Sequence, residues 1–197
     1  MRDMRHDIKN ILFTLGGYIE KSSDTEMKDY YNKTIRPFTE NKIKESEILS
    51  KIYTIPKDTL KSFFYMQCSK MMASEISIDF SAEIDPEKFR VGINELDLIR
   101  ILGILLDNAS DEALNCSRKY VKISIRNNGN GASYIITNSI MPYTKSHGVH
   151  AGVSSKGEGH GNGLRIINEI LDGYDNAMLN SNMGDDDFTQ CLNISYR

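Results

Sequence analysis

GEGHGNGL, residues 157–164, is the stretch that decides the fold, because glycine stands at every second position directly before an apolar helical pattern. Leu164, Ile167 and Leu171 recur at spacings of three and four, which predicts a helix over residues 164–171. Glycine backbone and a helix N-terminus together bring bare N–H groups against phosphates. Glycine-rich loops are also ordinary turns, so the stretch alone leaves both interpretations open.

Two other segments place polar groups on predicted helices. LLDNASDEA, residues 105–113, carries an asparagine among carboxylates, and RHDIKN, residues 5–10, supplies a histidine near the start of the chain. A His-Asp-x-x-Asn box, an Asp-Asn-Ala box and a Gly-x-Gly-x-Gly-x-Gly-Leu box in this order resemble those of a sensor histidine kinase. The residues in these boxes, together with TNS at 137–139 and SSKG at 154–157, are similar to those of the AgrC-like group. These are the quorum-sensing kinases that respond to peptide pheromones.

The resemblance covers essentially the whole chain. It implies an α+β fold: an N-terminal helical hairpin that forms a dimeric four-helix bundle, followed by a GHKL (Bergerat-type) α/β sandwich that binds ATP. It implies autophosphorylation of a histidine with Mg-ATP, and transfer of the phosphoryl group to the receiver domain of a response regulator. It also implies a homodimer that continues upstream into a membrane sensor domain, so that this chain is the cytoplasmic portion of a cell-membrane protein.

Composition is that of an ordinary globular protein. Of 197 residues, 40% are apolar and 26% are charged, and the net charge is −3. There is no basic stripe and no tryptophan, so a nucleic-acid partner is not expected. The longest apolar run, residues 98–106, is far short of the ~20 residues that span a bilayer. Three widely spaced cysteines, an odd number, indicate free thiols in a reducing compartment such as the cytoplasm.

Residues 1–52 are predicted to form the helical hairpin. Apolar spacings of three and four predict helices over 6–21 and 25–52, with Ser23 or Asp24 as the N-cap of the second helix. Pro37 lies inside the second helix and is expected to kink it. Two amphipathic helices cannot cover each other fully, which favours dimerisation. The second helix is the longer one, so we expect matching turns of the first helix upstream of this sequence.

A proline-containing linker at 53–56 separates the hairpin from an ATP-binding domain at 57–197. There, helical and strand patterns are interspersed, which predicts a mixed sheet covered by helices on one face. The expected helices are 59–75, 95–116 and 164–171, and the expected strands are 76–83, 121–126, 133–137, 177–180 and 189–196.

His6 is the predicted phosphoacceptor. A neutral imidazole, with an ordinary pKa of ~6.5, is a competent nucleophile at neutral pH. Asn10 lies one helical turn along the same face and is placed to hold a phosphoryl oxygen. Asp7 can accept the Nδ1–H of the ring and so present Nε2. Spacing alone favours a solvated histidine at a frayed terminus, and only the resemblance favours the phosphoacceptor.

Asn108 is the predicted Mg²⁺ ligand. Mg²⁺ takes hard oxygen ligands and keeps several waters while it bridges nucleotide phosphates, and an amide oxygen on a helix suits it. The resemblance implies that this asparagine holds the metal. Asp111, one turn on, is placed to organise the coordinated waters, whereas Asp107 and Glu112 are expected to be surface charges. The alternative is the plain polar face of an amphipathic helix.

The phosphate end of the nucleotide site is predicted around the glycine stretch. Residues 139–155 have no apolar period, which fits a lid that closes over the nucleotide. His147 and His150 are three apart, but no cysteine or second carboxylate accompanies them, so a zinc site is not expected. Lys156 offers a mobile cation and His160 a weaker one. The predicted contacts at this end are Lys156, Gly157, Gly159, His160, Gly161, Gly163 and Leu164.

Two residues depart from the pattern of the wider family. Asn138 stands where most relatives have an aspartate that accepts the adenine amino proton, and its amide oxygen can still accept, but without charge assistance. Ile104 replaces a residue that is polar in many relatives. The lack of a water-activating group there favours transfer to a histidine over ATP hydrolysis.

Two other functions stay open at this point. A phosphotransfer protein with the same hairpin would carry phosphate on His6 without using ATP. A non-catalytic module would bind ATP only as a conformational ligand and would tolerate the loss of His6.

Overall fold

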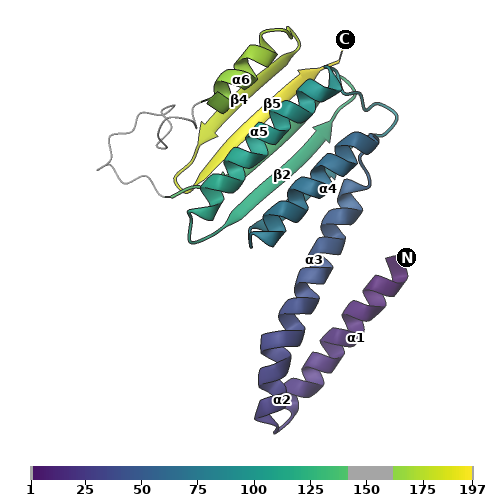
Figure 1. The fold of residues 1–197 in the computed structure, drawn as a ribbon. Coiled ribbons are helices and arrows are strands. Elements are labelled where there is room, and N and C mark those ends of the chain that lie inside the picture. The colour runs from purple at the N-terminus through teal and green to yellow at the C-terminus, as the bar shows by residue number, and fades with distance from the viewer. Residues whose placement is uncertain (1, 142–161, 197) are drawn as a thin grey trace. The chain divides into compact units, whose positions relative to one another are not determined.

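The structure, a computed structural model, describes residues 2–141 and 162–196, and for residues 2–9 it describes the backbone alone. The chain divides into two compact units, Met1–Ser50 and Lys51–Arg197, and each is described by itself. Figure 1 shows the helices of the first unit and the sheet and helices of the second. None of the described helices has both the length and the apolar character that a membrane crossing requires.

The first unit is a pair of helices joined by a short turn. Helix α1 (Arg2–Lys21) is followed by α2 (Thr25–Tyr30). The Asp24 carboxylate accepts hydrogen bonds from the backbone N–H groups of Glu26 and Met27, both at 3.0 Å. Asp24 is therefore the N-cap, which confirms one of the two candidates and satisfies two N–H groups that a helix start leaves without partners.

The long second helix is interrupted upstream of Pro37. A π-helical segment, η1 (Tyr31–Ile35), separates α2 from α3 (Arg36–Ile52). The Arg36 N–H bonds the carbonyl of Tyr31, five residues back. Proline has no N–H, and its ring crowds the carbonyl four residues earlier. The disturbance predicted at Pro37 therefore takes the form of one widened turn.

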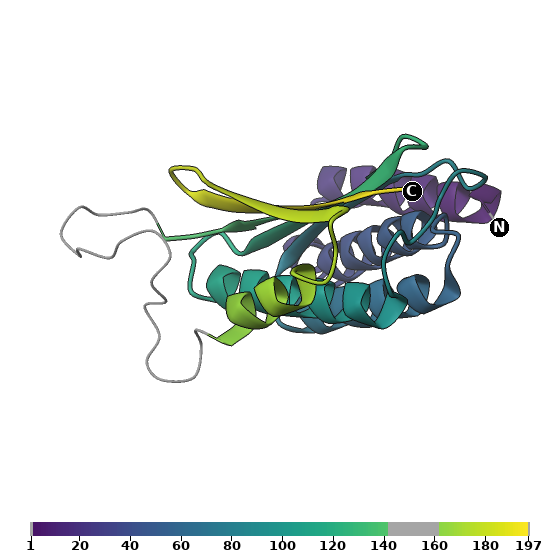
Figure 2. The ribbon, with the colours of Figure 1, turned by 90° about the horizontal axis from the view of Figure 1, so that it is seen from above.

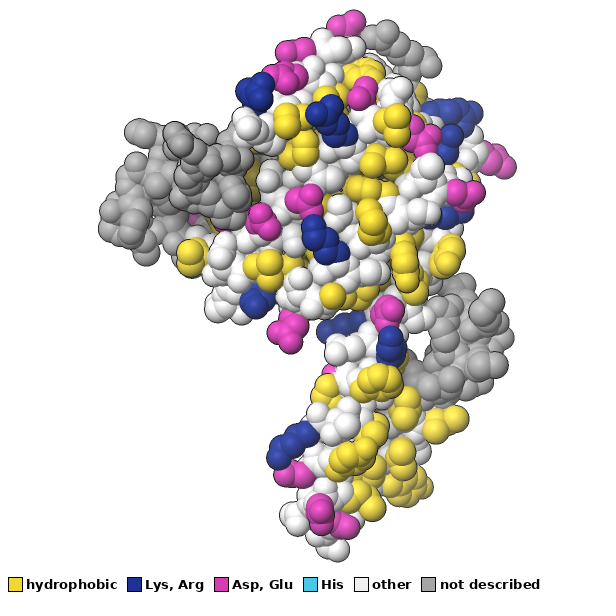
Figure 3. All heavy atoms as spheres, in the orientation of Figure 1, with side chains coloured by type: hydrophobic (Ala, Val, Ile, Leu, Met, Phe, Trp, Pro, Cys, Tyr) yellow, Lys and Arg dark blue, Asp and Glu magenta, His cyan; other side chains and the backbone are white. Residues whose placement is uncertain are grey.

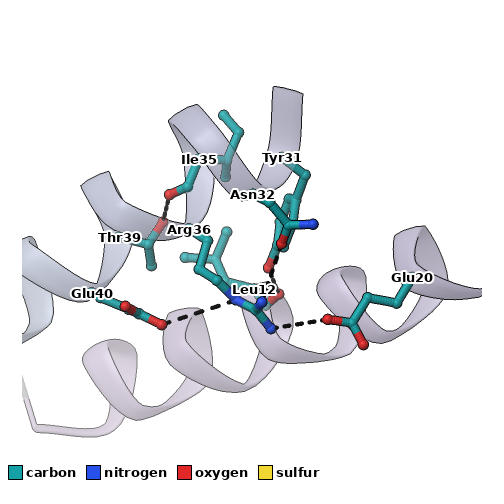
Figure 4. Close-up of polar contacts among 8 residues, drawn as sticks. All are labelled: Leu12, Glu20, Tyr31, Asn32, Ile35, Arg36, Thr39 and Glu40. Atoms are coloured by element: carbon teal, nitrogen blue, oxygen red, sulfur yellow. Dashed lines mark hydrogen bonds and ion pairs between the residues drawn. The ribbon is translucent and has the colours of Figure 1, made fainter. Parts of the chain in front are cut away.

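Tyr31 fixes this π turn to α1 (Figure 4). Its hydroxyl donates to the Leu12 carbonyl oxygen at 3.0 Å, and its ring is buried. A Cβ atom on Gly16 would lie 2.4 Å from the Tyr31 hydroxyl, so only glycine lets the phenol approach α1 this closely. Arg36 adds an ion pair with Glu20 at 3.2 Å. The hairpin is thus held together at the π turn.

The second unit is a five-stranded mixed sheet with helices on one face (Figure 2). The strands are β1 (Ser77–Glu83), β2 (Tyr120–Asn127), β3 (Gly131–Ser139), β4 (Ala177–Met183) and β5 (Asp187–Ser195). Their order in the sheet is β1-β2-β3-β5-β4, with β1 parallel to β2 and the other pairs antiparallel. The helices are α4 (Asp58–Ala73), α5 (Glu95–Leu114) and α6 (Asn162–Leu171). The predicted α/β sandwich is confirmed.

The core lies between the sheet and the helices. In β3, Ala132, Tyr134 and Ile136 alternate with half-buried Ser133, Ile135 and Thr137, as expected for a sheet with one covered face. Leu98, Ile101 and Leu105 of α5 are fully buried, and α5 packs on β3. Burial also raises the pKa of the Cys68 thiol to about 12, so it is a neutral core group.

Several predicted boundaries were wrong at element ends. Strand β3 extends to Ser139 and therefore includes Asn138, and β4 continues to Met183 because its ladder with β5 runs unbroken from Ala177. Helix α6, described from Asn162 onward, includes Asn162 and Gly163 and so does not begin at Leu164. The first N–H groups of a helix need no partner within it, so Gly163 can lie in its first turn although it reads as a loop residue.

Candidate functional site

Helix α5 presents Asn108 to solvent. The Asn94 side chain caps its start by accepting from the N–H groups of Leu96 and Asp97. Buried Leu105 and Ala109 fix the rotation of the helix against the sheet. Asn108 and Asp111 are consequently both exposed and lie one turn apart on the outer side.

The N-terminus of α6 lies against this part of α5. A Cβ atom on Gly163 would be 2.8 Å from Cγ2 of Ile104, 3.6 Å from Nδ2 of Asn108 and 3.9 Å from Oδ1 of Asn108. The first N–H groups of α6 have no partner within the helix and carry its positive dipole end. The structure therefore brings a metal-type amide oxygen and an anion-attracting helix start to one place.

Asn138 lies at the end of β3, on the same side of the sheet as the core. It follows the alternation of Tyr134 and Ile136, and only 3% of its surface is exposed. Its Nδ2 donates to the carbonyl oxygen of Ser139 at 2.9 Å. Because two carbonyl oxygens would repel at that distance, this bond fixes which end of the amide is the donor. The Asn138 oxygen therefore points away from Ser139.

An ion pair next to Asn108 was missed by the sequence analysis. Lys70 of α4 donates to the Asp107 carboxylate at 2.9 Å, and this hydrogen bond raises the pKa of Lys70. Asp107 is exposed, as expected, but it also ties α4 to the helix that carries the predicted metal ligand. The two residues are 37 positions apart, and no sequence pattern links them.

The described residues fit a nucleotide with Mg²⁺ at this place. No group of three or more His, Cys, Asp or Glu side chains that could hold a metal occurs among the side chains that the structure describes. Mg²⁺ bound to phosphates needs only one or two protein oxygens, and the Asn108 amide oxygen would be one of them. The glycine at 163 leaves the space beside this amide free of a side chain.

Several other predicted site residues are not tested by the structure. Lys156, Gly157, Gly159, His160 and Gly161 lie outside the described residues, as do residues 142–155 of the proposed lid with its histidines. The lid was predicted to start at Ser139, which is wrong, because Ser139 pairs with β5 as the last residue of β3. His6 and Asp7 lie in α1 with only their backbone described, and Asn10 is exposed on the same helix. Gly163 is at the site, and Leu164 follows it in the first turn, 44% exposed.

The second unit also has an open hollow of about 570 Å³, lined by residues that include Arg90, Tyr174 and Tyr196. This hollow lies at the end of the sheet opposite to Asn138, the residue predicted to bind adenine. Asn138 pairs with Phe188 at the start of β5, whereas Tyr196 follows the end of that strand. The site around Asn108 is therefore defined by its residues, not by this hollow.

Comparison with known proteins agrees with this geometry. The sequence profile of the GHKL domain matches residues 93–195, which is more than half of the chain and includes Asn108, Asn138 and Gly163. The chain belongs to the GHKL domain family, whose members bind ATP, typically with Mg²⁺. No protein of curated function matches the sequence.

Solved structures with a similar fold are histidine kinase domains. Two nucleotide-free structures of the catalytic domain of histidine kinase ThkA align with TM-scores of 0.52 and 0.50, at 16% and 14% identity. They cover 76% and 77% of this chain and 91% and 92% of theirs. Histidine kinase AdeS of Acinetobacter baumannii aligns over all of this chain and 98% of its own, at 13% identity and a TM-score of 0.45. At these identities the likeness to the two ThkA structures concerns the fold alone.

Proposed function

We propose that this chain is the kinase core of a sensor histidine kinase of the AgrC-like, quorum-sensing group. It binds Mg-ATP, phosphorylates itself on His6 and passes the phosphoryl group to the receiver domain of a response regulator. The observation that carries the proposal is the meeting of Asn108 with the glycine-containing N-terminus of α6, in a domain of a family that binds ATP.

The residues of the nucleotide site would position the γ-phosphoryl group and neutralise its charge. Mg²⁺, when bound, would neutralise negative charge on the phosphates. The Asn108 amide oxygen would hold the metal, and Asp111 would orient its waters. The N–H groups of α6 would face phosphate oxygens. The Asn138 oxygen, which points away from Ser139, would accept from the adenine amino group.

His6 would provide the nucleophile. The unprotonated ring nitrogen attacks the γ-phosphorus in line, the bond from that phosphorus to the bridging oxygen breaks, and ADP leaves. Asp7 would hold the proton on the other ring nitrogen, and Asn10 would hold a phosphoryl oxygen. The protein forms no other covalent bond in this transfer, so most of the rate acceleration would come from positioning the reacting groups.

Incubation of the whole chain with γ-labelled ATP and Mg²⁺ tests the proposal. We expect an acid-labile, base-stable phosphoprotein. His6→Gln should abolish labelling and leave nucleotide affinity within about twofold, because the two sites lie on different compact units. Asn108→Ala should abolish labelling together with Mg²⁺-dependent nucleotide binding.

Each alternative function gives a distinct result. Nucleotide binding without labelling would identify a non-catalytic ATP-binding module. Labelling only from a phosphorylated donor protein would identify a phosphotransfer protein. Equal labelling of wild type and His6→Gln would remove His6 from the mechanism. A mixture of the two inactive variants that regains labelling would show transfer between copies.

A further inference from the structure

Strand β4 is an edge strand. Its Ala177 N–H donates to the Tyr174 carbonyl oxygen, but the outward backbone groups of Leu179, Ser181 and Met183 are unpaired among the described residues. Strand β4 neighbours β5 only. The Gly184 N–H donates to the Asp187 carbonyl oxygen, and the Asn176 carbonyl oxygen accepts from the Ser195 N–H. The backbone groups of the even-numbered residues along β4 therefore point to β5. The alternation of a ladder then directs the N–H and C=O groups of Leu179, Ser181 and Met183 to the free edge.

The composition of this edge is unusual. Edge strands are normally protected by charges, proline or bulges. AMLNSNM, the whole of β4, has no charged residue and no proline, and its ladder with β5 runs without a bulge. It also exposes Met178 and Met183, at 58% and 54%. The opposite edge, β1, carries Asp79 and Glu83, both exposed, so self-pairing there would oppose like charges.

The sequence of β4 is self-complementary about Ser181. In an antiparallel pair centred on this residue, Leu179 of one copy opposes Met183 of the other, and Ser181 opposes itself. These three residues are the ones whose N–H and C=O groups face the free edge, so in this register they can form the hydrogen bonds of an antiparallel ladder with the second copy. On the other face of the sheet, Asn180 opposes Asn182 of the second copy, and their amides can bond each other.

We propose that β4 pairs antiparallel with β4 of a second copy of this chain, in the register centred on Ser181, and so joins two sheets into one. The partner strand is β4 of a second copy, because this pairing places apolar side chains opposite apolar ones and amides opposite amides. No charged side chains of β4 face each other across it. The interface is isologous, as a two-fold dimer requires. It is separate from the dimerisation proposed for the hairpin, and a chain that uses both would link dimers into larger assemblies.

Ser181→Pro tests the pairing with a matched control. The Ser181 N–H faces the free edge, so proline there removes an edge donor without removing a bond to β5. Ser181→Ala keeps the N–H and loses the same contact with Gln190, whose Nε2 lies 3.4 Å from the Ser181 hydroxyl. In sedimentation equilibrium of the whole chain carrying Phe38→Glu, a change that weakens association through the hairpin, we expect Ser181→Pro to raise the dissociation constant about tenfold, because two backbone bonds are lost by symmetry. Ser181→Ala in the same background should associate like the chain with Phe38→Glu alone.

A pair of double variants tests the register. Asn180→Lys with Asn182→Glu sets opposite charges against each other across the interface, and should tighten association relative to Asn180→Lys with Asn182→Lys, which sets like charges there. Circular dichroism should show all variants folded. Equal association of the Phe38→Glu chain alone, with Ser181→Pro and with either double variant would overturn the proposal, and a preference opposite to the expected one would overturn the register.

Discussion

At the residue scale, the proposed nucleotide site depends on a missing side chain. Gly163 lies so close to Ile104 and Asn108 that a methyl group has no room without displacing the branched methyl of Ile104. The close approach of α6 to α5, more than the conformational freedom of glycine, explains why residue 163 is a glycine. It also gives Ile104 a role that its departure from the family pattern does not suggest, since its side chain forms the surface on which α6 begins.

Gly163→Ala should therefore weaken both the fold and the site. We expect the free energy of unfolding to fall by about 1–3 kcal/mol, as for other overpacked positions, and Mg-ATP affinity to fall with it because α6 moves from Asn108. The measurements are denaturant unfolding and calorimetric titration. Adding Ile104→Leu, which lacks the branched methyl, should restore part of both quantities. If the single variant binds Mg-ATP like wild type, α6 does not contribute to the site in this position.

At the scale of elements, the two adjacent glycines of α1 have different surroundings. Gly16 is buried against the Tyr31 hydroxyl, whereas Gly17 has no neighbour within 4 Å of an added Cβ atom among the described residues. The π turn before Pro37 places Tyr31 on α1, so the hairpin depends on the pair Gly16 and Tyr31. Gly17 contributes only the cost of an unnecessary glycine in a helix.

Alanine substitutions separate these two roles. Gly16→Ala should destabilise the hairpin, because its Cβ would lie 2.4 Å from the Tyr31 hydroxyl. Gly17→Ala should stabilise α1 by about 0.5–1 kcal/mol. Thermal unfolding followed by far-ultraviolet circular dichroism reports both effects. A shift of the transition in the same direction by both variants would contradict a stabilising contact between Gly16 and Tyr31.

At the scale of the whole molecule, the hairpin exposes more large apolar side chains than a monomer needs. Figure 3 shows hydrophobic side chains gathered on this unit. The exposed members include Phe38 and Tyr18, at 66% and 73%. A monomer seldom leaves such a surface uncovered, which supports the homodimer expected from the amphipathic pattern. The exposed large apolar residues of the hairpin are Ile11, Phe13, Leu15, Tyr18, Met27, Tyr30 and Phe38.

Phe38→Glu should weaken this hairpin dimer. Burial of a Phe side chain contributes about 1.5–3 kcal/mol, so the change should raise the dimer dissociation constant at least tenfold. Sedimentation velocity over a range of concentrations measures it, in a Ser181→Pro background so that association through β4 does not contribute. Lys44→Glu, which changes charge by more at a polar position of the same helix, is the control. An unchanged dissociation constant would place dimerisation elsewhere.

The sequence by itself determined most of the local elements and predicted the type of site. Apolar spacing identified the helices and strands, Asp24 was among the predicted caps, and the glycine box with Asn108 indicated a phosphate and metal site because these residue types suit that chemistry wherever they occur. It was less reliable at element ends, since the lengths of β3 and β4 depend on ladders with distant partners and not on their own residues.

Only the tertiary structure decided which residues meet. The contact of Gly163 with Ile104 and Asn108, the Lys70–Asp107 ion pair and the seat of Tyr31 on Gly16 join residues that are far apart in sequence. The free edge of β4 likewise follows from the strand order, in which β5 returns between β3 and β4. Local spacing cannot encode such pairings, because they result from the packing of helices on a sheet whose order differs from that of the chain.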